Sequence, residues 1–160
     1  MEMSLRVFFN RWFAGMVCLG MIALICSFLV VHLFHLKPCV LCKLQRIPFA
    51  LLVANATLGL IGPYKKGFFK VTQLCLGLGV LLGGVHFLMQ MGMVPDFCVS
   101  QRGFDSPEAF LKGLQGPKCS QVAWDVGGVP VSLMSATLQG LVLWVSIRLK
   151  AIVKRRVLCK

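Results

Sequence analysis

Two pairs of cysteines are the residues of this chain best suited to chemistry. Cys39 and Cys42 form a C-x-x-C motif in a short polar gap between two apolar runs, and Cys98 and Cys119 lie in the long polar stretch between the later runs. The C-x-x-C spacing closes a small disulfide ring and is typical of redox dithiols, although zinc sites use the same spacing. Two such pairs favour electron transfer, and we predict that all four cysteines are catalytic.

Two non-enzymatic alternatives compete with this prediction. A zinc ion needs four ligands, and the four cysteines supply them, with His32 or His35 as substitutes. Both pairs can also be inert structural disulfides. Against zinc, only one pair has tight spacing, and an oxidising compartment favours disulfides over thiolate ligands. We therefore expect no bound metal.

Three polar residues are predicted to form a binding pocket beside this motif. Cys42 is expected at the beginning of a helix, where free N–H groups and the helix dipole stabilise a thiolate. Arg46 falls one turn later, just inside the apolar layer, where a charge marks a functional candidate. His86 and Gln90 share one helix face at the same depth. The alternatives are an arginine that snorkels to the headgroups and a simple interhelical hydrogen bond.

Four apolar runs must position these residues. The chain has 160 residues, of which 58% are hydrophobic and 14% charged, whereas a soluble domain is about one quarter charged. The mean hydropathy is +0.82. Runs that reach the roughly 20 residues needed to cross a membrane cover residues 12–34, 44–62, 69–91 and 129–149. The first run is too long for a cleaved signal peptide, so we expect an uncleaved helix.

These runs predict a single membrane domain over residues 1–160, an all-α bundle of four transmembrane helices. Its two outer loops are expected at residues 35–43 and 92–128. In the second loop, Ser106-Pro107-Glu108 is a strong helix start. Phe110, Leu111 and Leu114 follow on one face, which predicts a short helix lying on the membrane surface.

The distribution of charge predicts the orientation of the chain. Its net charge of +12 gathers at the edges of the apolar runs, so we expect no nucleic-acid binding. Eleven of the 17 Lys and Arg lie at the termini and in the middle connection, and six lie on the opposite side. The positive-inside rule then predicts cytoplasmic termini and places both cysteine pairs in the oxidising compartment. The other four cysteines are expected to be bystanders: Cys18, Cys26, Cys75 and Cys159.

The order of these features resembles the disulfide bond formation protein B (DsbB) family of bacterial inner-membrane quinone reductases. The stretch from Pro38 to Arg46, which contains the C-x-x-C motif, carries the first part of the resemblance. His86 to Gln90 and then Cys98 follow in the same order. The last part is Cys119, which leads into Trp124-Asp125 and Gly127-Gly128 before the final helix.

The resemblance implies a relay of disulfides in the bacterial inner membrane. A DsbA-like periplasmic oxidase of thioredoxin fold would attack a Cys98–Cys119 disulfide, Cys119 would pass to Cys39, and Cys42 would donate to a quinone, either ubiquinone or menaquinone. Arg46 would stabilise the negative charge, with His86 and Gln90 near the quinone. The nearest rival is a vitamin-K-epoxide-reductase-like enzyme, in which the C-x-x-C motif follows the loop cysteines. Here the motif comes first.

Overall fold

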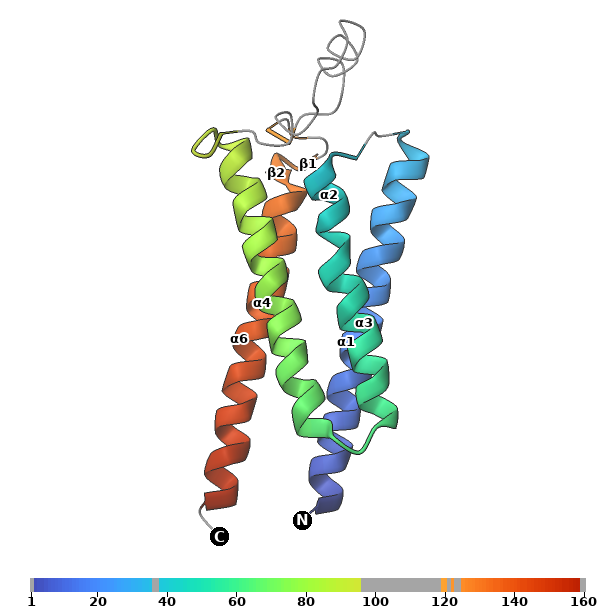
Figure 1. Ribbon diagram of the computed structural model, residues 1–160, viewed down its shortest axis with the longest axis vertical. Coiled ribbons are helices and arrows are strands. Elements are labelled where there is room, and N and C mark those ends of the chain that lie inside the picture. The colour runs from blue at the N-terminus through green and yellow to red at the C-terminus, as the bar shows by residue number, and fades with distance from the viewer. Residues whose placement is uncertain (1, 36–37, 96–118, 121, 123–124, 159–160) are drawn as a thin grey trace, which may run out of the picture.

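Four long helical segments stand side by side in the computed structural model (Figure 1), which describes residues 2–35, 38–95, 119–120, 122 and 125–158. The helices are α1 (Glu2–Leu33), α2 (Val40–Leu44), α3 (Arg46–Ile61), α4 (Lys65–Gln90) and α6 (Val131–Leu158). Four segments are long and apolar enough to cross a membrane: Arg6–Leu33, Val40–Ile61, Lys65–Gln90 and Val131–Ala151. The predicted four-helix membrane bundle is confirmed.

The second membrane segment consists of two helices, α2 and α3, that meet at Gln45. Pro48 explains the interruption, because it has no N–H to donate to the carbonyl of Leu44 and its ring crowds that carbonyl. The segment begins at Val40, whereas the apolar run in the sequence begins only at residue 44. Cys42 therefore lies within a helical turn of the membrane segment and not in a loop before it.

The other helices also extend beyond the apolar runs that the sequence marks. Lys65 is the first residue of α4 and donates from Nζ to the carbonyl oxygens of Gly59 and Leu60, each at 2.7 Å. These bonds satisfy carbonyls at the end of α3 that have no partner within their own helix. Hydropathy locates the part of a helix that lies in lipid, while hydrogen bonding decides where the helix ends.

A small β-hairpin precedes the last helix, and its second strand covers residues 129–130, which the sequence analysis counted as the first residues of the last apolar run. Its strands are β1 (Asp125–Val126) and β2 (Val129–Pro130), paired antiparallel. Gly127 and Gly128 form the two-residue turn with φ values of 61° and 82°, the positive values that a type I′ turn requires. The carboxylate of Asp125 accepts a hydrogen bond from the Gly128 N–H at 3.0 Å. This turn fixes the start of α6.

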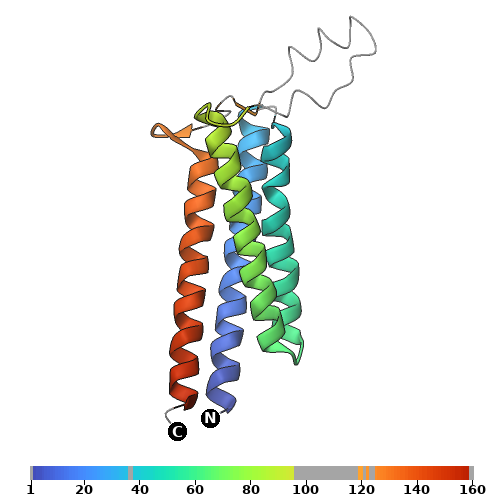
Figure 2. The same ribbon diagram turned by 60° about the vertical axis from the view of Figure 1, so that its left-hand side comes forward.

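The helices pack in an open order rather than as a closed ring. Helix α1 packs on α3, α3 on α4, and α4 on α6, while α1 and α6 make little contact along their described lengths. Figures 1 and 2 show α4 standing between α6 and α3. Phe13, Leu52 and Leu76 are the centre of the main apolar core. One side of the bundle, between α1 and α6, is thus without a close helix–helix contact.

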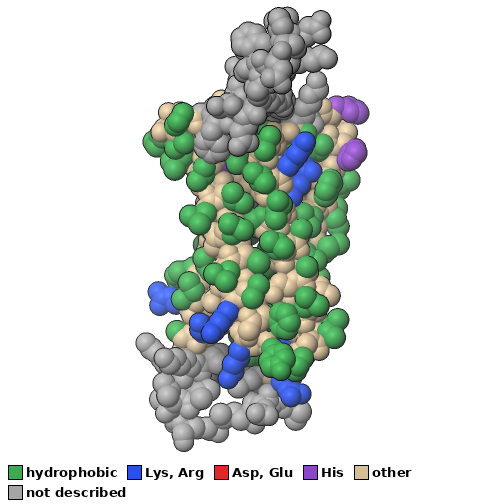
Figure 3. All heavy atoms as spheres, viewed as in Figure 1, with side chains coloured by type: hydrophobic (Ala, Val, Ile, Leu, Met, Phe, Trp, Pro, Cys, Tyr) green, Lys and Arg blue, Asp and Glu red, His purple; other side chains and the backbone are tan. Residues whose placement is uncertain are grey.

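Both chain termini lie at one end of the bundle, and the cysteine motif lies at the other (Figure 1). The surface between the two ends is covered largely by hydrophobic side chains, and Lys and Arg gather mainly towards the end with the termini (Figure 3). This charge distribution is the one from which the sequence predicted cytoplasmic termini. The predicted surface helix near Ser106 and the predicted catalytic Cys98 both lie outside the described residues.

Candidate active site

The C-x-x-C motif forms the first turn of α2. Cys39 is the N-cap residue, with extended backbone (φ −66°, ψ 169°), and its Sγ accepts a hydrogen bond from the Cys42 N–H at 3.2 Å. Cys42 therefore lies at the beginning of a helix, as the sequence predicted. Both residues are free thiols here, with Cys39 buried and Cys42 half-buried. The two sulfur atoms thus differ in burial and in the backbone groups that they meet.

The protonation of Cys39 is biased by this arrangement. Its hydrogen bond with the Cys42 side chain and its own burial raise the pKa of the Cys39 thiol well above the usual range, and these causes outweigh the lowering effect of His86. Cys39 therefore keeps its proton at neutral pH. In a dithiol with one retained proton, the nucleophilic or electron-donating sulfur is the other one, which here is Cys42.

His86 connects α4 to the motif. Its Nε2 lies 3.7 Å from the Cys39 Sγ and 3.5 Å from the amide nitrogen of Gln90. The Gln90 oxygen accepts a hydrogen bond from the hydroxyl of Ser132 on α6, so the Gln90 NH₂ group is the part that faces the imidazole. His86 Nε2 must then be an acceptor, which puts the ring proton on Nδ1. The two predicted polar residues of α4 therefore form one hydrogen-bonded chain from α2 to α6.

Arg46 is held by α1. Its Nε donates to the hydroxyl of Ser27 at 2.9 Å, and its Nη2 donates to the Ser27 carbonyl at 3.3 Å. The guanidinium also lies over the ring of Phe28, 4.5 Å from the ring centre. These contacts fix the charged group at the level of the motif, so Arg46 does not simply snorkel away from the apolar layer. Serine at position 27 is a functional candidate that the sequence analysis missed.

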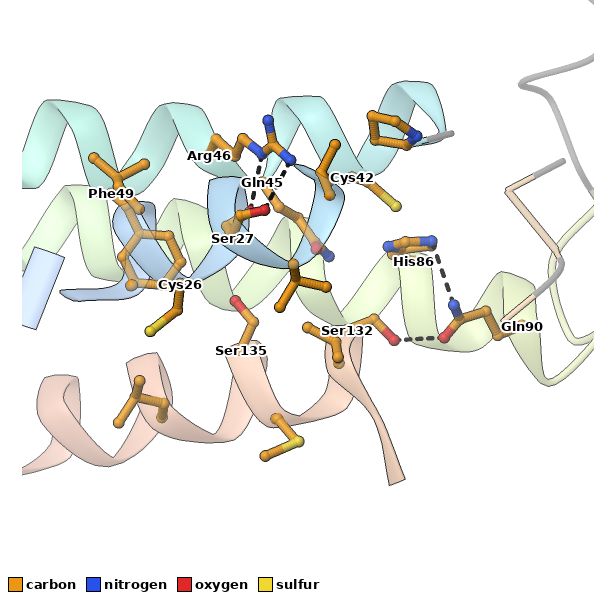
Figure 4. A pocket seen from close by; sticks show the side chains of 18 residues that line it. Cys26, Ser27, Cys42, Gln45, Arg46, Phe49, His86, Gln90, Ser132 and Ser135 are labelled. Carbon is orange, nitrogen blue, oxygen red and sulfur yellow. Dashed lines mark hydrogen bonds between the residues drawn. The ribbon is translucent and has the colours of Figure 1, made fainter. Parts of the chain in front are cut away.

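A cavity of about 500 Å³ lies between these side chains. Figure 4 shows His86 between Cys42 and Gln90, with Arg46 and Ser27 on one wall and Ser132 and Ser135 of α6 on another. The rest of the lining is largely apolar and comes from α1, α3 and α6, including Ala23, Leu24, Val30, Val31, Phe49, Val131 and Leu138. Walls from both α1 and α6 place the cavity on the side of the bundle where these helices make little contact.

Two buried polar atoms of this cavity have no hydrogen-bond partner among the described residues. They are Gln45 Nε2 and His86 Nδ1, and both residues line the cavity. A buried polar group without a partner costs about 1–3 kcal/mol. Gln45 Nε2 is a donor, and so is Nδ1 in the tautomer that Gln90 imposes on His86. The cavity therefore offers two donors to a ligand that brings acceptors.

Cys119 lies beside the motif. It is fully buried in an apolar cluster that also contains Cys39, Leu41 and Met89. Cys119 is disulfide-bonded, whereas the other described cysteines are free, so its partner is none of Cys18, Cys26, Cys39, Cys42 and Cys75. The structure thus brings together three of the four predicted catalytic cysteines, together with Arg46, His86 and Gln90.

Serines from two apolar runs complete the site that the sequence only partly predicted. Ser27 and Ser132 have no sequence signal beyond being hydroxyls inside or at the end of a membrane segment. Such hydroxyls bond either to the backbone of their own helix or to a neighbouring helix. Their partners, Arg46 and Gln90, became evident only from the packing of the helices.

The fold and the site define a class: a multi-pass membrane protein with a helix-capping dithiol beside a largely apolar cavity. Comparison with known proteins gives the family. The family described as disulfide bond formation protein DsbB matches residues 10–149, and the chain belongs to it. The chain is also similar to the disulfide bond formation protein B of Dechloromonas aromatica (strain RCB), with 30% identity over 138 residues, covering 77% of this chain and 81% of that protein. No solved structure matched.

Membership of this family gives the protein a role in disulfide bond formation. The protein is a disulfide-forming oxidoreductase of the membrane, and that role requires a partner with which it exchanges disulfides. The resemblance noted in the sequence is confirmed at the level of the family.

Proposed function

We propose that this protein reoxidises a periplasmic DsbA-like thiol oxidase and passes the electrons through two cysteine pairs to a membrane quinone. The observation that carries the proposal is the position of the Cys39–Cys42 dithiol at the edge of a largely apolar cavity, in which two donors have no partner among the described residues. The first pair in the relay is Cys98 and Cys119, and the second is Cys39 and Cys42.

The cavity fits a quinone by shape and by chemistry. A quinone headgroup has two carbonyl acceptors on an apolar ring, and the cavity offers donors at Gln45 and His86 within largely apolar walls. A volume of about 500 Å³ lies in the usual range for small-molecule sites. The weak contact between α1 and α6 leaves a route for an isoprenoid tail to reach the lipid. A bound quinone supplies the acceptor for the two electrons and two protons released when Cys39 and Cys42 form a disulfide.

The side chains around the dithiol have separate tasks in this proposal. Cys42 is the sulfur that faces the cavity and gives up electrons, while Cys39 keeps its proton until its own sulfur becomes part of a disulfide. His86 Nε2, 3.7 Å from the Cys39 Sγ, is placed to accept that proton. Arg46 stabilises the negative charge that develops in the cavity, since such a charge in a low-dielectric site gains most from a fixed cation.

Exchange between the two cysteine pairs needs little movement. Cys119 is packed in the same buried cluster as Cys39. Attack by a partner on Cys98 would release Cys119 as a thiolate, which then attacks Cys39 of the oxidised second pair and frees Cys42. The second thiol of the partner resolves the mixed disulfide and frees Cys98. Cys98 then attacks Cys119 and frees Cys39, so that Cys39 and Cys42 are both thiols before the quinone oxidises them. Each exchange breaks one S–S bond and forms another, so the number of disulfides is conserved until Cys39 and Cys42 are oxidised again.

The energetics explain why a strong acceptor is needed. A DsbA-type oxidase has a potential near −120 mV, and a structural disulfide lies below about −300 mV. The gap of about 180 mV corresponds to roughly 8 kcal/mol for two electrons, since about 30 mV is worth 1.4 kcal/mol. A disulfide with such a low potential cannot oxidise the dithiol of a DsbA-type protein. The relay therefore has to end on an acceptor with a higher potential. A lipid-soluble quinone in the cavity meets this requirement.

Quinone reduction by the purified protein tests the proposal. Reduced DsbA-type protein is the electron donor, ubiquinone or menaquinone analogues are the acceptors, and quinone absorbance reports turnover. We expect Cys42→Ser and Cys98→Ser to abolish turnover while each protein still folds. Cys18→Ala is the matched control, because Cys18 is an exposed thiol within α1. Normal turnover in Cys42→Ser would refute the relay and favour structural disulfides.

The proposed orientation in a bacterial inner membrane has cytoplasmic termini and both cysteine pairs in the periplasm. It rests on the gathering of Lys and Arg towards the end of the bundle that holds the termini (Figure 3). A reporter that fluoresces only in the cytoplasm, fused after Lys160, should fluoresce. A reporter fused in the loop between α1 and α2 should stay dark, and the reverse result would contradict the orientation.

A further inference from the structure

The reduced site has the donor atoms and the spacing of a metal site. Each of Cys39, Cys42 and His86 offers a ligand atom within 4.8 Å of the other two. The Cys39 Sγ lies 3.7 Å from His86 Nε2. In a tetrahedral zinc site with bonds of about 2.3 Å to sulfur and about 2.0 Å to nitrogen, that pair of atoms lies about 3.5 Å apart. This edge of the tetrahedron therefore needs almost no movement.

The chemistry of the three donors suits a thiophilic cation. Two thiolates and an imidazole are the ligands that zinc prefers in proteins. Gln90 donates its N–H to His86 Nε2, so that nitrogen has a lone pair to offer and does not carry the ring proton. Breaking the weak 3.5 Å contact with Gln90 frees the lone pair for a metal. The cavity next to Cys42 and His86 leaves room for a water molecule as the fourth ligand.

Charge does not oppose binding. Two thiolates neutralise a divalent cation, so the occupied site carries no net charge within the apolar layer. Among the described residues that line the cavity, the cation is Arg46, which is held by Ser27 and lies over Phe28. It therefore faces a neutral complex rather than an unpaired positive ion.

We infer that the dithiol form of this site binds one Zn²⁺ through Cys39, Cys42 and His86 Nε2, and that the bound ion blocks reoxidation of the dithiol. Binding displaces two thiol protons and transfers no electrons. Oxidation to the disulfide removes both thiolates, so the metal and the disulfide exclude each other. The binding stands independently of the proposed function, whereas the inhibition rests on it.

Metal binding to the purified full-length protein in detergent tests the inference. The protein is reduced, freed of reductant without air, and titrated with Zn²⁺ in competition with a coloured chelator. In the variant Cys98→Ser/Cys119→Ser, which lacks the other pair, we expect one equivalent of Zn²⁺ for the reduced protein. After oxidation we expect none. Co²⁺ in place of Zn²⁺ should give the intense visible bands of a tetrahedral thiolate site.

Variants of single ligands locate the ion. Loss of a residue that only orients a metal ligand lowers metal affinity about 10- to 100-fold. Loss of a ligand itself should lower the affinity for Zn²⁺ at least as much. We expect this loss in His86→Ala and Cys42→Ser. His86→Cys restores a third ligand and should recover most of the affinity. Cys26→Ala is the matched control, because Cys26 is a free thiol that lines the same cavity without belonging to the trio.

Turnover in the presence of Zn²⁺ decides the second half of the inference. We expect Zn²⁺ to inhibit quinone reduction at the concentrations that fill the site, and a chelator to reverse the inhibition. Binding that is equal in the reduced and oxidised proteins, or unchanged in His86→Ala, would overturn the site. Binding with the expected ligand dependence but undisturbed turnover would overturn the inhibition alone. A protein without any quinone turnover would refute the proposed function and leave the binding result intact.

Discussion

Replacing Ser27 with alanine tests whether Arg46 has to be held in place for the proposed quinone reaction. Alanine removes the 2.9 Å bond from Arg46 Nε to the Ser27 hydroxyl and leaves the 3.3 Å bond to the Ser27 carbonyl and the contact with Phe28. The helix α1 keeps its course, because alanine is a better helix former than serine. The variant therefore loosens the guanidinium without removing its charge.

The size of the effect follows from the bond that is lost. A hydrogen bond to a charged group is worth about 1.5–3 kcal/mol. Arg46 is only half-buried, and water compensates part of the loss, so we use about 1–1.4 kcal/mol. Since 1.4 kcal/mol is a factor of ten, kcat/KM for quinone should fall about 5- to 10-fold. The KM for the reduced protein partner should not change, because that partner reacts at the other cysteine pair.

Three variants make this prediction refutable. Ser27→Thr keeps a hydroxyl and should recover most of the activity, while Cys18→Ala alters a residue of α1 that does not line the cavity and should have little effect. In an Arg46→Met protein, Ser27→Ala should add no further loss. The reasoning fails if Ser27→Ala is as harmful in Arg46→Met as in the natural chain, or if it changes the KM for the protein partner.

Three further predictions concern packing and pH. A Cβ at Gly79 would collide with the side-chain amide of Gln139, so Gly79→Ala should lower the free energy of unfolding in detergent by about 1–3 kcal/mol; adding Gln139→Ala should restore part of it, and a lack of any rescue would contradict the clash. Asn55 donates to Thr72 Oγ1 at 2.9 Å, so Asn55→Ala should cost about 0.6–1.7 kcal/mol in the same measurement, and no loss would contradict a role in packing. Because the pKa of Cys39 is raised, its alkylation in the reduced protein should keep accelerating above about pH 9, where an ordinary thiol with a pKa near 8.5 levels off; a plateau there, seen by mass spectrometry, would contradict the retained proton.

Much of the candidate site could be predicted because it depends on spacing within one helix. Cys42 and Arg46 lie one turn apart, and so do His86 and Gln90, and helical periodicity puts each pair on one face. The four membrane segments are also local properties, since any apolar run of about 20 residues can span a bilayer. These features require no knowledge of which helix lies beside which.

The exact beginnings of the helices were harder to predict from hydropathy. Val40 begins the second membrane segment, and the hairpin around Gly127 and Gly128 delays α6 to Val131. In both places a local hydrogen bond or turn decides the boundary. The N-cap Cys39 accepts a hydrogen bond from the Cys42 N–H, and the two glycines form a turn with positive φ. Neither feature changes the mean hydropathy of its segment.

The sequence by itself determined the class of the protein: four membrane helices, a C-x-x-C motif at a helix start, and a charge asymmetry that predicts the orientation of the chain. The tertiary structure decided which side chains of different helices contact one another. Only packing brings His86 to Cys39, Ser27 to Arg46 and Ser132 to Gln90. Only the order of the helices leaves a cavity on the side between α1 and α6. Contacts between helices depend on how complementary surfaces fit together over their whole length, and no spacing within a single helix encodes that fit.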